Sequence, residues 1–438
     1  MTEIFQYIIQ FLLGDNVSPA ISSKIGYTAN PKEFKKYKIV ILSSGFFDSE
    51  RYGTTDSLPV LPLKIWEETP ILYGEPVVEI HGKTRVIHAD LVASTYFLIT
   101  RYEEMIHRDK RDVHGRFPGK ESLPYVAGFI DSPLVDEYGH LLRLELREAG
   151  IEIPELPQKI NKIYLTHDVD QLSHFRTARG FMGGLLRGIQ RPKEGNKAIK
   201  SYFGGLKNDP WYTFPWLFKL DNSIRQSVGS ERCEPIVFIK IGGGNRKEDQ
   251  PFVWHHIQDF QTLITLCKKK NITFGLHSSY EAGISPYRIP DEKKQLERAT
   301  KRKTTYNRHH YLDSREPEDM QVLIEAGITD DFSMGYADMA GFRLGTSRAV
   351  RWINPSTLQL TNLTLHPLTI MDSSLSEKKY MNMNAHQSYE YCIRLINKVE
   401  RWNGELVLLW HNTSVEDTPR LYHRKLYQDL ISYLKKNS

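Results

Sequence analysis

The chain has little cysteine and no long hydrophobic run, and both shortages exclude classes of protein. Its 438 residues include three cysteines, Cys233, Cys267 and Cys392, an odd number at wide spacing with no C-x-x-C pair. A disulfide framework and a zinc–thiolate site are therefore not expected. No apolar run approaches the roughly 20 residues that span a bilayer, so we expect no integral membrane segment.

A basic leader is missing as well. The stretch Met1–Leu13 is partly apolar, but it begins with Glu3 and lacks a basic region ahead of the apolar one. It predicts an amphipathic first helix, not a signal peptide. Reduced cysteines and the lack of an export signal predict a cytoplasmic protein. If its substrate is a glycan, we expect a glycan precursor.

The excess of positive charge is small. Lysine and arginine total 58 against 53 acidic residues, which gives a net charge of +5 and a pI of about 8.8. The basic residues are spread along the chain, whereas nucleic-acid binding usually needs a clustered basic face. We therefore expect no nucleic-acid partner. Hydrophobic residues at 40% and charged residues at 25% are ordinary for a folded protein.

The first part of the chain, residues 1–156, mixes short strand and helix patterns. Ala89–Glu104 has apolar residues at helical spacing and predicts a buried helix. Two prolines, at positions 154 and 157, mark a linker. The sequence thus predicts a smaller α/β domain of unknown role over 1–156, followed by a second domain over 157–438.

Beyond the linker, short apolar runs alternate with helical patterns such as Asp291–Lys303 and Ala385–Trp402. This alternation predicts a mainly parallel sheet or barrel. The predicted strands are Ile163–Leu165, Ile236–Ile239, Ile272–Leu276, Thr305–Arg308 and Leu406–Trp410. Polar residues follow several of them, at the strand ends where barrels of this type carry their active sites.

Two of these strand ends supply carboxylates and an imidazole. Asp168 and Asp170 follow the first strand, so one can bind a metal while the other takes a proton from water. His277 ends a later strand, and imidazole there is a good ligand for a divalent cation. Taken singly, an Asx turn explains the aspartates and a hydrogen-bonded core histidine explains His277 at least as well.

Two further strand ends add basic groups. Arg308 could orient a carboxylate through paired hydrogen bonds, and His310 beside it could supply another metal ligand. His411 emerges from a very apolar strand next to Trp410, and a desolvated histidine can serve as a general acid. A basic surface turn and a buried histidine are the structural alternatives. Four such signals within one domain are stronger together than each alone.

The order of these motifs resembles the NodB-type polysaccharide deacetylases, carbohydrate esterase family 4. That family has an aspartate pair, a histidine motif, an arginine motif and a final L-x-x-H, which here correspond to Asp168/Asp170, His277, Arg308 and Leu408–His411. The resemblance implies an irregular (β/α) barrel of about seven strands over residue 162 to His411, and removal of an acyl group from a sugar amide.

The match is closest to a divergent branch of the family with an uncharacterised α/β domain ahead of the barrel. This branch shows the long string D-[FY]-S-M-G-Y-A-D-x-x-G-F-R-x-G-T-S, which is present here over residues 331–347. The first part of the chain also resembles that preceding domain, through Ser94–Glu104 and Asp112–Phe117.

Two departures from the family pattern leave choices open. The family motif H-[ST]-x-x-H supplies two histidine ligands, but in this chain Glu281 stands at the position of the second histidine. Our first candidate for the remaining metal ligand is therefore His310, and Glu281 is the second. The usual D-x-x-D-W motif is absent too. Asp338 could take over its task of orienting His411, and Asp331 is the alternative.

These correspondences predict a divalent ion, zinc foremost, held by Asp170, His277 and His310. Asp168, oriented by Arg308, is expected to act as the base, and His411 as the acid that protonates the leaving amine. A backbone N–H near Tyr311 is expected to stabilise the oxyanion. The predicted substrate-binding residues are Tyr311, Tyr336, Asp338, Arg343 and Trp410. For Trp410, core packing is an equally good explanation. For Arg343 and the turn 345–347, which could bind an anionic group of the substrate, a structural turn is the better explanation.

The predicted function is that of a metal-dependent hydrolase that removes an acyl group, most simply acetyl, from the amide nitrogen of a sugar or glycan precursor. The main alternative is a catalytically inactive barrel that binds carbohydrate or acts as a scaffold, and the missing second histidine favours it. A phosphohydrolase with an H-D pair on a helix is disfavoured, because the apolar β-type run Ile163–Leu165 precedes His167.

Overall fold

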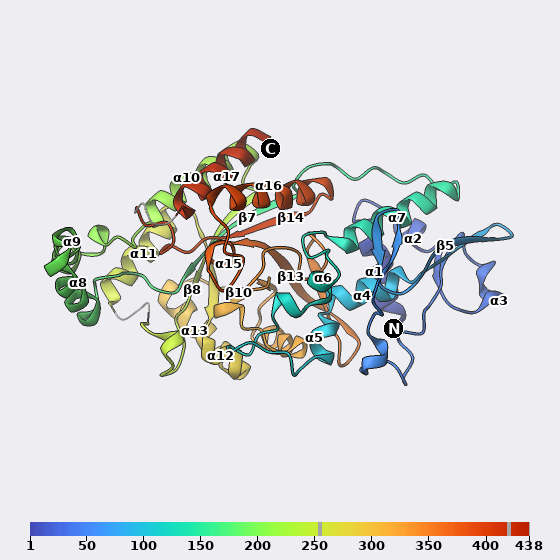
Figure 1. Ribbon diagram of the computed structural model, residues 1–438, viewed down its shortest axis with the longest axis horizontal. Coiled ribbons are helices and arrows are strands. Elements are labelled where there is room, and N and C mark those ends of the chain that lie inside the picture. Colours follow the sequence, from blue (N-terminus) through green and yellow to red (C-terminus); the bar gives the residue numbers. More distant parts are fainter. Residues whose placement is uncertain (253–255, 418–421, 438) are drawn as a thin grey trace.

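The computed structural model describes residues 1–252, 256–417 and 422–437. Figure 1 shows an N-terminal α/β part on the right, in blue and teal, and a larger barrel to its left. A pair of helices at the far left extends beyond the barrel. No helix in the described ranges is long and apolar enough to cross a membrane.

The N-terminal part is built on a small mixed sheet with helices packed on it. The buried helix α4 and the longer helix α7 contact α1, and their apolar faces share one core. A separate two-stranded hairpin of β3 (Lys64–Trp66) and β4 (Thr69–Ile71) lies beside them. The sheet order is β1 (Ile25–Tyr27), β2 (Ile39–Ile41), β6 (Thr84–Ala89) and β5 (Gly74–His81), with only β5 antiparallel. The helices are α1 (Thr2–Leu13), α4 (Leu91–Ile99) and α7 (Leu134–Glu148).

The single helix predicted over Ala89–Glu104 is divided in two. After α4 the chain adopts a left-handed conformation at Arg101 (φ 58°), and α5 (Tyr102–Ile106) begins beyond it. The break has a tertiary cause. The buried guanidinium of Arg101 pairs with Glu104 and donates to the carbonyl oxygen of Ser314 at 2.8 Å, so contacts with the barrel outweigh helical propensity.

The second part is a closed barrel of seven parallel strands, each paired with its neighbours in chain order. Closure occurs where β11 pairs with β13, while β12 (Val350–Asn354) lies antiparallel on the other edge of β13. The barrel strands are β7 (Lys162–Val169), β8 (Cys233–Ile239), β9 (Thr273–Ser278), β10 (Tyr306–His309), β11 (Asp330–Met334), β13 (Gln359–Met371) and β14 (Glu405–Leu409). The predicted irregular (β/α) barrel with a smaller α/β unit ahead of it is confirmed.

Helices cover the outside of the barrel. Figure 1 shows α10, α16 and α17 stacked along one side and α13 on another. Two of them match the predicted helices: α13 (Ile289–Thr300) and α16 (Ala385–Arg401). The others are α10 (Phe214–Val228), α11 (Ile257–Lys269), α14 (Gln321–Glu325) and α17 (His423–Asn437).

Alternation along β7 decides which of its polar side chains can reach the site. Successive side chains of a strand point to opposite faces. His167 points outward, where its Nε2 lies 3.0 Å from Asp221 Oδ2 of α10 and its Nδ1–H donates to the Trp410 carbonyl. Asp168 therefore points into the barrel. The histidine of this motif is a structural residue that fastens α10 to the sheet.

At the end of the barrel opposite to Asp168, a buried histidine forms ion pairs with two carboxylates. His366 of β13 lies between Asp330 and Glu405, the first residues of β11 and β14, at 3.0 and 2.7 Å. Its ring stacks on Phe332 at 4.3 Å. Burial alone would lower the pKa of His366, but the carboxylates of Glu405 and Asp330 raise it to about 9.

These ion pairs predict a pH-dependent contribution to stability. Because the folded-state pKa exceeds the unfolded value, the stabilisation is fully present below about pH 6.5 and is lost as pH rises through 9. For His366→Gln we expect the free energy of unfolding to fall by about 2 kcal/mol more at pH 6 than at pH 10. Urea denaturation at both pH values measures it. The control is His386→Gln, whose side chain is 79% exposed; an equal loss at both pH values for His366→Gln would contradict the assignment.

Candidate metal and hydrolase site

The carboxyl ends of the parallel strands surround one cavity of about 520 Å³. Asp168 at the end of β7, Asp170 just beyond it, His277 of β9, His310 after β10 and His411 after β14 all line this cavity. Tyr311 lines it as well. Four segments far apart in the sequence therefore meet where the sequence predicted a site, because parallel strands end at one edge of the barrel.

Asp170, His277 and His310 form a compact group of possible metal ligands. One ligand atom from each lies within 4.8 Å of the other two. The Nε2 atoms of His277 and His310 are 3.1 and 3.4 Å from Asp170 Oδ1. Burial alone would raise the pKa of Asp170, but the two histidines hold it well below its usual range. Asp170 is therefore a carboxylate, the form that binds a cation.

The tautomer of His277 suits a ligand. Its Nδ1 lies 2.9 Å from the carbonyl oxygen of Arg308, which can only accept a hydrogen bond. Nδ1 therefore carries a proton, which leaves Nε2, on the side of Asp170, as the nitrogen that can bind a cation. Around a tetrahedral zinc ion with ligand distances near 2.1 Å, neighbouring ligand atoms lie about 3.4 Å apart. The two distances to Asp170 fit such an ion.

The structure separates the two candidates for the third ligand. His310 lies beside His277, with ring centroids 5.0 Å apart. Glu281, at the start of α12 (Tyr280–Ile284), directs its carboxylate to Arg246 Nε at 2.8 Å. Among the described residues, it is His310 and not Glu281 that groups with Asp170 and His277.

A buried arginine orients Asp168. Arg308 Nη1 donates to Asp168 Oδ1 at 2.9 Å and to Thr166 Oγ1 at 2.7 Å, and its guanidinium lies over the Phe238 ring at 4.5 Å. The other oxygen, Asp168 Oδ2, is 3.6 Å from His277 Nε2. Asp168 thus presents one oxygen to the candidate metal ligands while the other is held in place, which suits a proton acceptor.

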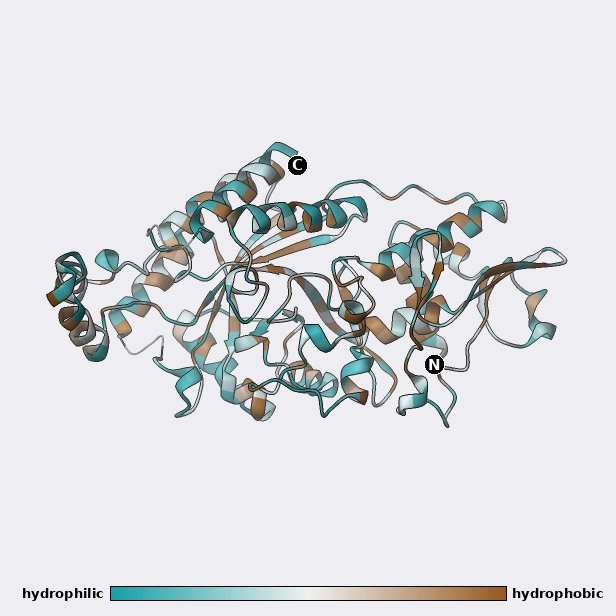
Figure 2. Cartoon of the chain, in the orientation of Figure 1, coloured by the Kyte–Doolittle hydropathy of each residue, from teal (hydrophilic) through white to brown (hydrophobic). Residues whose placement is uncertain are grey.

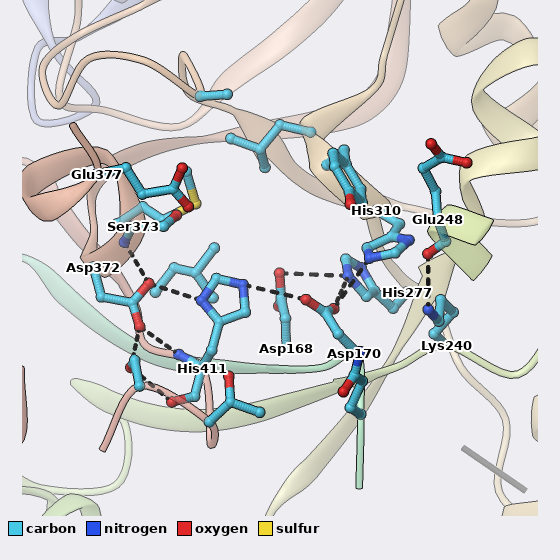
Figure 3. A pocket seen from close by; sticks show the side chains of 18 of the residues that line it. Asp168, Asp170, Lys240, Glu248, His277, His310, Asp372, Ser373, Glu377 and His411 are labelled. Carbon is cyan, nitrogen blue, oxygen red and sulfur yellow. Dashed lines mark hydrogen bonds and ion pairs between the residues drawn. The ribbon is translucent and has the colours of Figure 1, made fainter. Parts of the chain in front are cut away.

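His411 is oriented by Asp372, a residue the sequence analysis missed. His411 Nδ1 lies 2.7 Å from Asp372 Oδ1, and its backbone N–H donates to Asp372 Oδ2 at 2.9 Å. Ser414 also donates to this carboxylate. His411 Nε2 faces Asp170 Oδ2 at 3.6 Å (Figure 3). A signal existed, since Asp372 directly follows the apolar end of β13, the same pattern as Asp168 and His411.

The charge of His411 follows from its neighbours. Burial alone would lower the pKa of this histidine, but Asp372, with further contributions from Asp170 and Asp168, raises it to about 10. Asp372 keeps a pKa of about 2, since His411 outweighs the effect of burial there. His411 therefore carries a proton at neutral pH that it can donate from Nε2.

A second missed carboxylate stands behind His310. Asp249 Oδ1 is 3.7 Å from His310 Nδ1, and the Asp249 carboxylate also accepts hydrogen bonds from the backbone N–H groups of Tyr280 and Glu281. Metal-binding histidines commonly have such an outer partner.

The glycine run 242–244 leaves room for the Asp249 carboxylate. A Cβ on Gly243, where φ is 123°, would lie 2.7 Å from Asp249 Cγ, so the lack of a side chain there leaves space for the carboxylate.

Four predicted substrate-binding residues lie elsewhere, and the prediction is corrected for them. Arg343 is buried in a paired contact with Glu104 at 2.8 and 2.9 Å, and Tyr336 packs beside it. Trp410 is fully buried, and its Nε1–H donates to the His423 carbonyl. Asp338 accepts hydrogen bonds from the backbone N–H groups of residues 119 and 120 and so does not orient His411. The alternative partner, Asp331, accepts from Asn307 and Ser333 instead.

These corrections share one cause: the long string at residues 331–347 joins the two parts of the chain. Arg343 pairs with Glu104 of α5, and Thr346 and Ser347 donate to Asp136 of α7. Arg348, next along the chain, pairs with the same Asp136 at 2.8 Å. Buried charges of this kind must be paired, so this stretch needs specific residues without touching a substrate.

The N-terminal part also reaches the cavity. Arg116 lines it, and its Nη1 donates to the Tyr311 carbonyl at 2.8 Å. Tyr311 has a left-handed backbone (φ 63°, ψ 8°), which is strained for a tyrosine. The His114 ring packs on the Tyr311 ring with centroids 4.8 Å apart. Residues 114–116 therefore hold Tyr311 in a conformation that it would not adopt unaided.

We expect Arg116→Ala to lower kcat/KM about 10- to 100-fold, because a small displacement of a positioning group costs that much, while metal content stays unchanged. The matched control is Arg108→Ala, since Arg108 joins the same two parts through Glu316 and Glu318 but does not line the cavity. Steady-state kinetics and metal analysis of both variants measure the effect. Equal losses in the two variants would mean that Arg116 serves only the interface.

Residues 1–150 match the profile of a family of unknown function, DUF7033. Among solved structures, the chain is similar to one described as "Crystal structure of putative polysaccharide deacetylase from Mycobacterium smegmatis". The sequence identity is 11% and the TM-score 0.40, over 65% of this chain and 86% of that chain. No curated protein is significantly similar in sequence. No functional inference follows from a likeness this distant.

Proposed function

We propose that the protein is a metal-dependent hydrolase that removes an acyl group, most simply acetyl, from the amide nitrogen of a sugar or glycan precursor. One observation carries the proposal: Asp170 lies between a pair of histidines on one side and His411 on the other, with Asp168 beside it (Figure 3). A candidate cation site, an oriented carboxylate and a protonated histidine thus face one cavity.

Asp170, His277 and His310 would hold the ion. A divalent metal there would lower the pKa of a bound water and polarise the carbonyl of the substrate. Three protein ligands with remaining positions for water and substrate are typical of catalytic zinc sites. The imidazole pair favours zinc over magnesium or calcium, which prefer oxygen ligands.

Two side chains would carry out the two proton transfers of the reaction. Asp168, with Oδ1 bound to Arg308, accepts the proton of the attacking water on Oδ2. His411, with Nδ1–H bound to Asp372, donates its Nε2 proton to the leaving nitrogen. An amine is a poor leaving group unless it is protonated, so an acid with a raised pKa suits an amide substrate. Tyr311 places its backbone beside the same cavity.

The lining of the cavity suits a carbohydrate. Lys247, Glu248, Glu377 and Lys379 contribute charged groups, and Tyr380 contributes a ring. Polar groups around the rim can bind hydroxyls, and an exposed tyrosine ring can pack on a sugar face.

The proposal is tested by metal analysis of the purified protein together with a screen for acetate release. The substrates are N-acetylated monosaccharides, oligosaccharides and nucleotide sugars, each assayed with protein as isolated, treated with a chelator, and resupplied with zinc. We expect about one ion per chain, and acetate release that disappears with the chelator and returns with zinc. A chain that holds no ion and releases no acetate would instead be a carbohydrate-binding barrel.

A further inference from the structure

Two helices extend from the barrel between β7 and β8. They are α8 (Ala178–Gln190) and α9 (Pro192–Gly204), joined at Arg191. Figure 1 shows them at the far left, beyond the body of the barrel. Residues 171–177 join Asp170 to α8, so this helical hairpin starts from the end of the barrel that carries the cavity.

Part of the contact between the two helices is formed by very small residues. A Cβ on Gly188 of α8 would lie 2.7 Å from the Cα of Gly195 of α9, and a Cβ on Gly184 would lie 2.6 Å from the Cβ of Ala198. Soluble helix pairs normally bury their large apolar side chains against each other. Here glycine and alanine form this part of the contact, and Phe181 of α8 stacks on Tyr202 of α9 with ring centroids 4.2 Å apart. Other large apolar side chains of the hairpin are left for other surfaces.

Several of those side chains face solvent. Five of the seventeen exposed large hydrophobic residues in the described chain lie on these two helices, and Figure 2 shows hydrophobic positions on the hairpin. On α8 they recur at steps of four and three residues, which places them on one face of the helix. They are Met182 (54% exposed), Leu186 (64%), Ile189 (79%), Ile199 (45%) and Phe203 (75%).

The hairpin and the turn that follows it hold an excess of positive charge. Residues 178–207 contain seven lysines and arginines and one acidic residue, Glu194, a net charge of +6, whereas the whole chain carries +5. The rest of the protein is thus close to neutral, because its other 51 basic residues are balanced by 52 acidic ones. Lys193, Lys197 and Lys200 are exposed and have no acidic partner within 4.0 Å among the described residues.

We propose that the α8–α9 hairpin docks on an anionic lipid surface. Exposed aliphatic and aromatic side chains flanked by lysine and arginine are the signature of a helix that lies in a membrane interface. Anionic headgroups complement the +6 charge. A second copy of the chain would bring another +6 face against the first, so self-association through the hairpin is disfavoured. Exposed Ile, Leu and Met offer nothing to phosphates or base edges, which disfavours a nucleic acid.

Docking would also orient the cavity. Because α8 begins a few residues after Asp170, a hairpin at the headgroups would hold the carboxyl-end edge of the barrel near the lipid surface. Binding to lipid does not depend on the proposed hydrolase activity. It is measured without substrate, so the failure of either proposal leaves the other standing.

The test is co-sedimentation of the full-length protein with vesicles of phosphatidylcholine alone or with about one third phosphatidylglycerol. We expect binding only to the anionic vesicles and weaker binding at high salt. Leu186→Asp/Ile189→Asp and Lys197→Glu/Lys200→Glu should each lower the partition coefficient about tenfold or more, given the contribution of each basic residue near such a surface. All four positions are exposed, so folding should be unchanged; circular dichroism verifies this.

Matched controls carry the same changes elsewhere. Val60→Asp/Ile80→Asp alters equally exposed apolar residues, and Lys24→Glu/Lys159→Glu alters exposed lysines, all outside the hairpin. Both controls should bind as the wild type does. Absence of wild-type binding to anionic vesicles, or equal losses in hairpin and control variants, would overturn the proposal. A dimer that the hairpin variants dissociate, without vesicle binding, would assign the surface to a second copy.

A labelled position gives a readout that does not depend on altered charge. The native cysteines are all buried, so Leu186→Cys can be labelled selectively with a polarity-sensitive fluorophore, and Val60→Cys serves as control. We expect a blue shift on adding anionic vesicles for the label at position 186 and none at position 60. No shift at position 186 would overturn the proposal.

Discussion

Replacing Asp170 by asparagine should abolish metal binding and hydrolysis together. Asp170 Oδ1 is the atom that both histidines face, at 3.1 and 3.4 Å, and it supplies the negative charge of the candidate ligand set. Loss of an outer-shell partner commonly costs about 10- to 100-fold in metal affinity or activity, so we expect a larger loss for this ligand. Metal content by mass spectrometry and acetate release measure both effects.

Glu281→Gln is the matched control for Asp170→Asn. It removes the charge of the other candidate ligand, a carboxylate bound to Arg246 and outside the group formed with His277. This variant should keep its metal and its activity within a small factor. Loss of metal from Glu281→Gln, with metal retained in Asp170→Asn, would exchange the two assignments.

Asp168→Asn should separate metal binding from catalysis. The amide can still accept a hydrogen bond from Arg308 through its oxygen, but it cannot take a proton. We expect the metal to remain and kcat to fall about 10²- to 10⁴-fold, the range that a general base contributes. KM should change little, because the proton transfer affects the transition state and not substrate binding.

The pH profile sharpens the test of Asp168. An acidic limb of kcat/KM that reports a base should be absent in Asp168→Asn, whereas a basic limb that reports His411 should remain. Asp338→Asn is the control, since that carboxylate caps the backbone of residues 119 and 120 and lies outside the cavity. Acetate release that is unchanged in Asp168→Asn would remove this residue as the base.

The structure shows how the N-terminal part contacts the barrel. It contacts the barrel through buried ion pairs, Arg343 with Glu104 and Arg348 with Asp136, and reaches the cavity through Arg116. Removing it would leave Arg343 buried without its partner, which is costly. Point variants such as Arg116→Ala are therefore better probes of its contribution than deletion.

The sequence by itself determined the residue types at the strand ends and their order. Asp168, Asp170, His277 and His411 each follow a short apolar run, whereas His310 follows the polar stretch Thr305–His309. Such stretches are set by local pattern. Once the strands are parallel, their ends must meet at one edge. The meeting of these side chains was predictable for this reason. The alternation of strand and helix patterns left a sheet or a barrel open, and the resemblance to the NodB-type family implied the barrel.

Only the tertiary structure decided what each of these residues contacts. Asp372 orients His411, and Asp249 lies next to His310, because segments distant in the chain approach each other. A single sequence contains no record of such pairs. The string around Arg343 looked like substrate-binding residues but joins the two parts, since its partner Glu104 lies 239 positions away. Local pattern specifies which groups a strand end can offer, whereas the packing of distant segments selects which of them face a cavity and which become buried ion pairs.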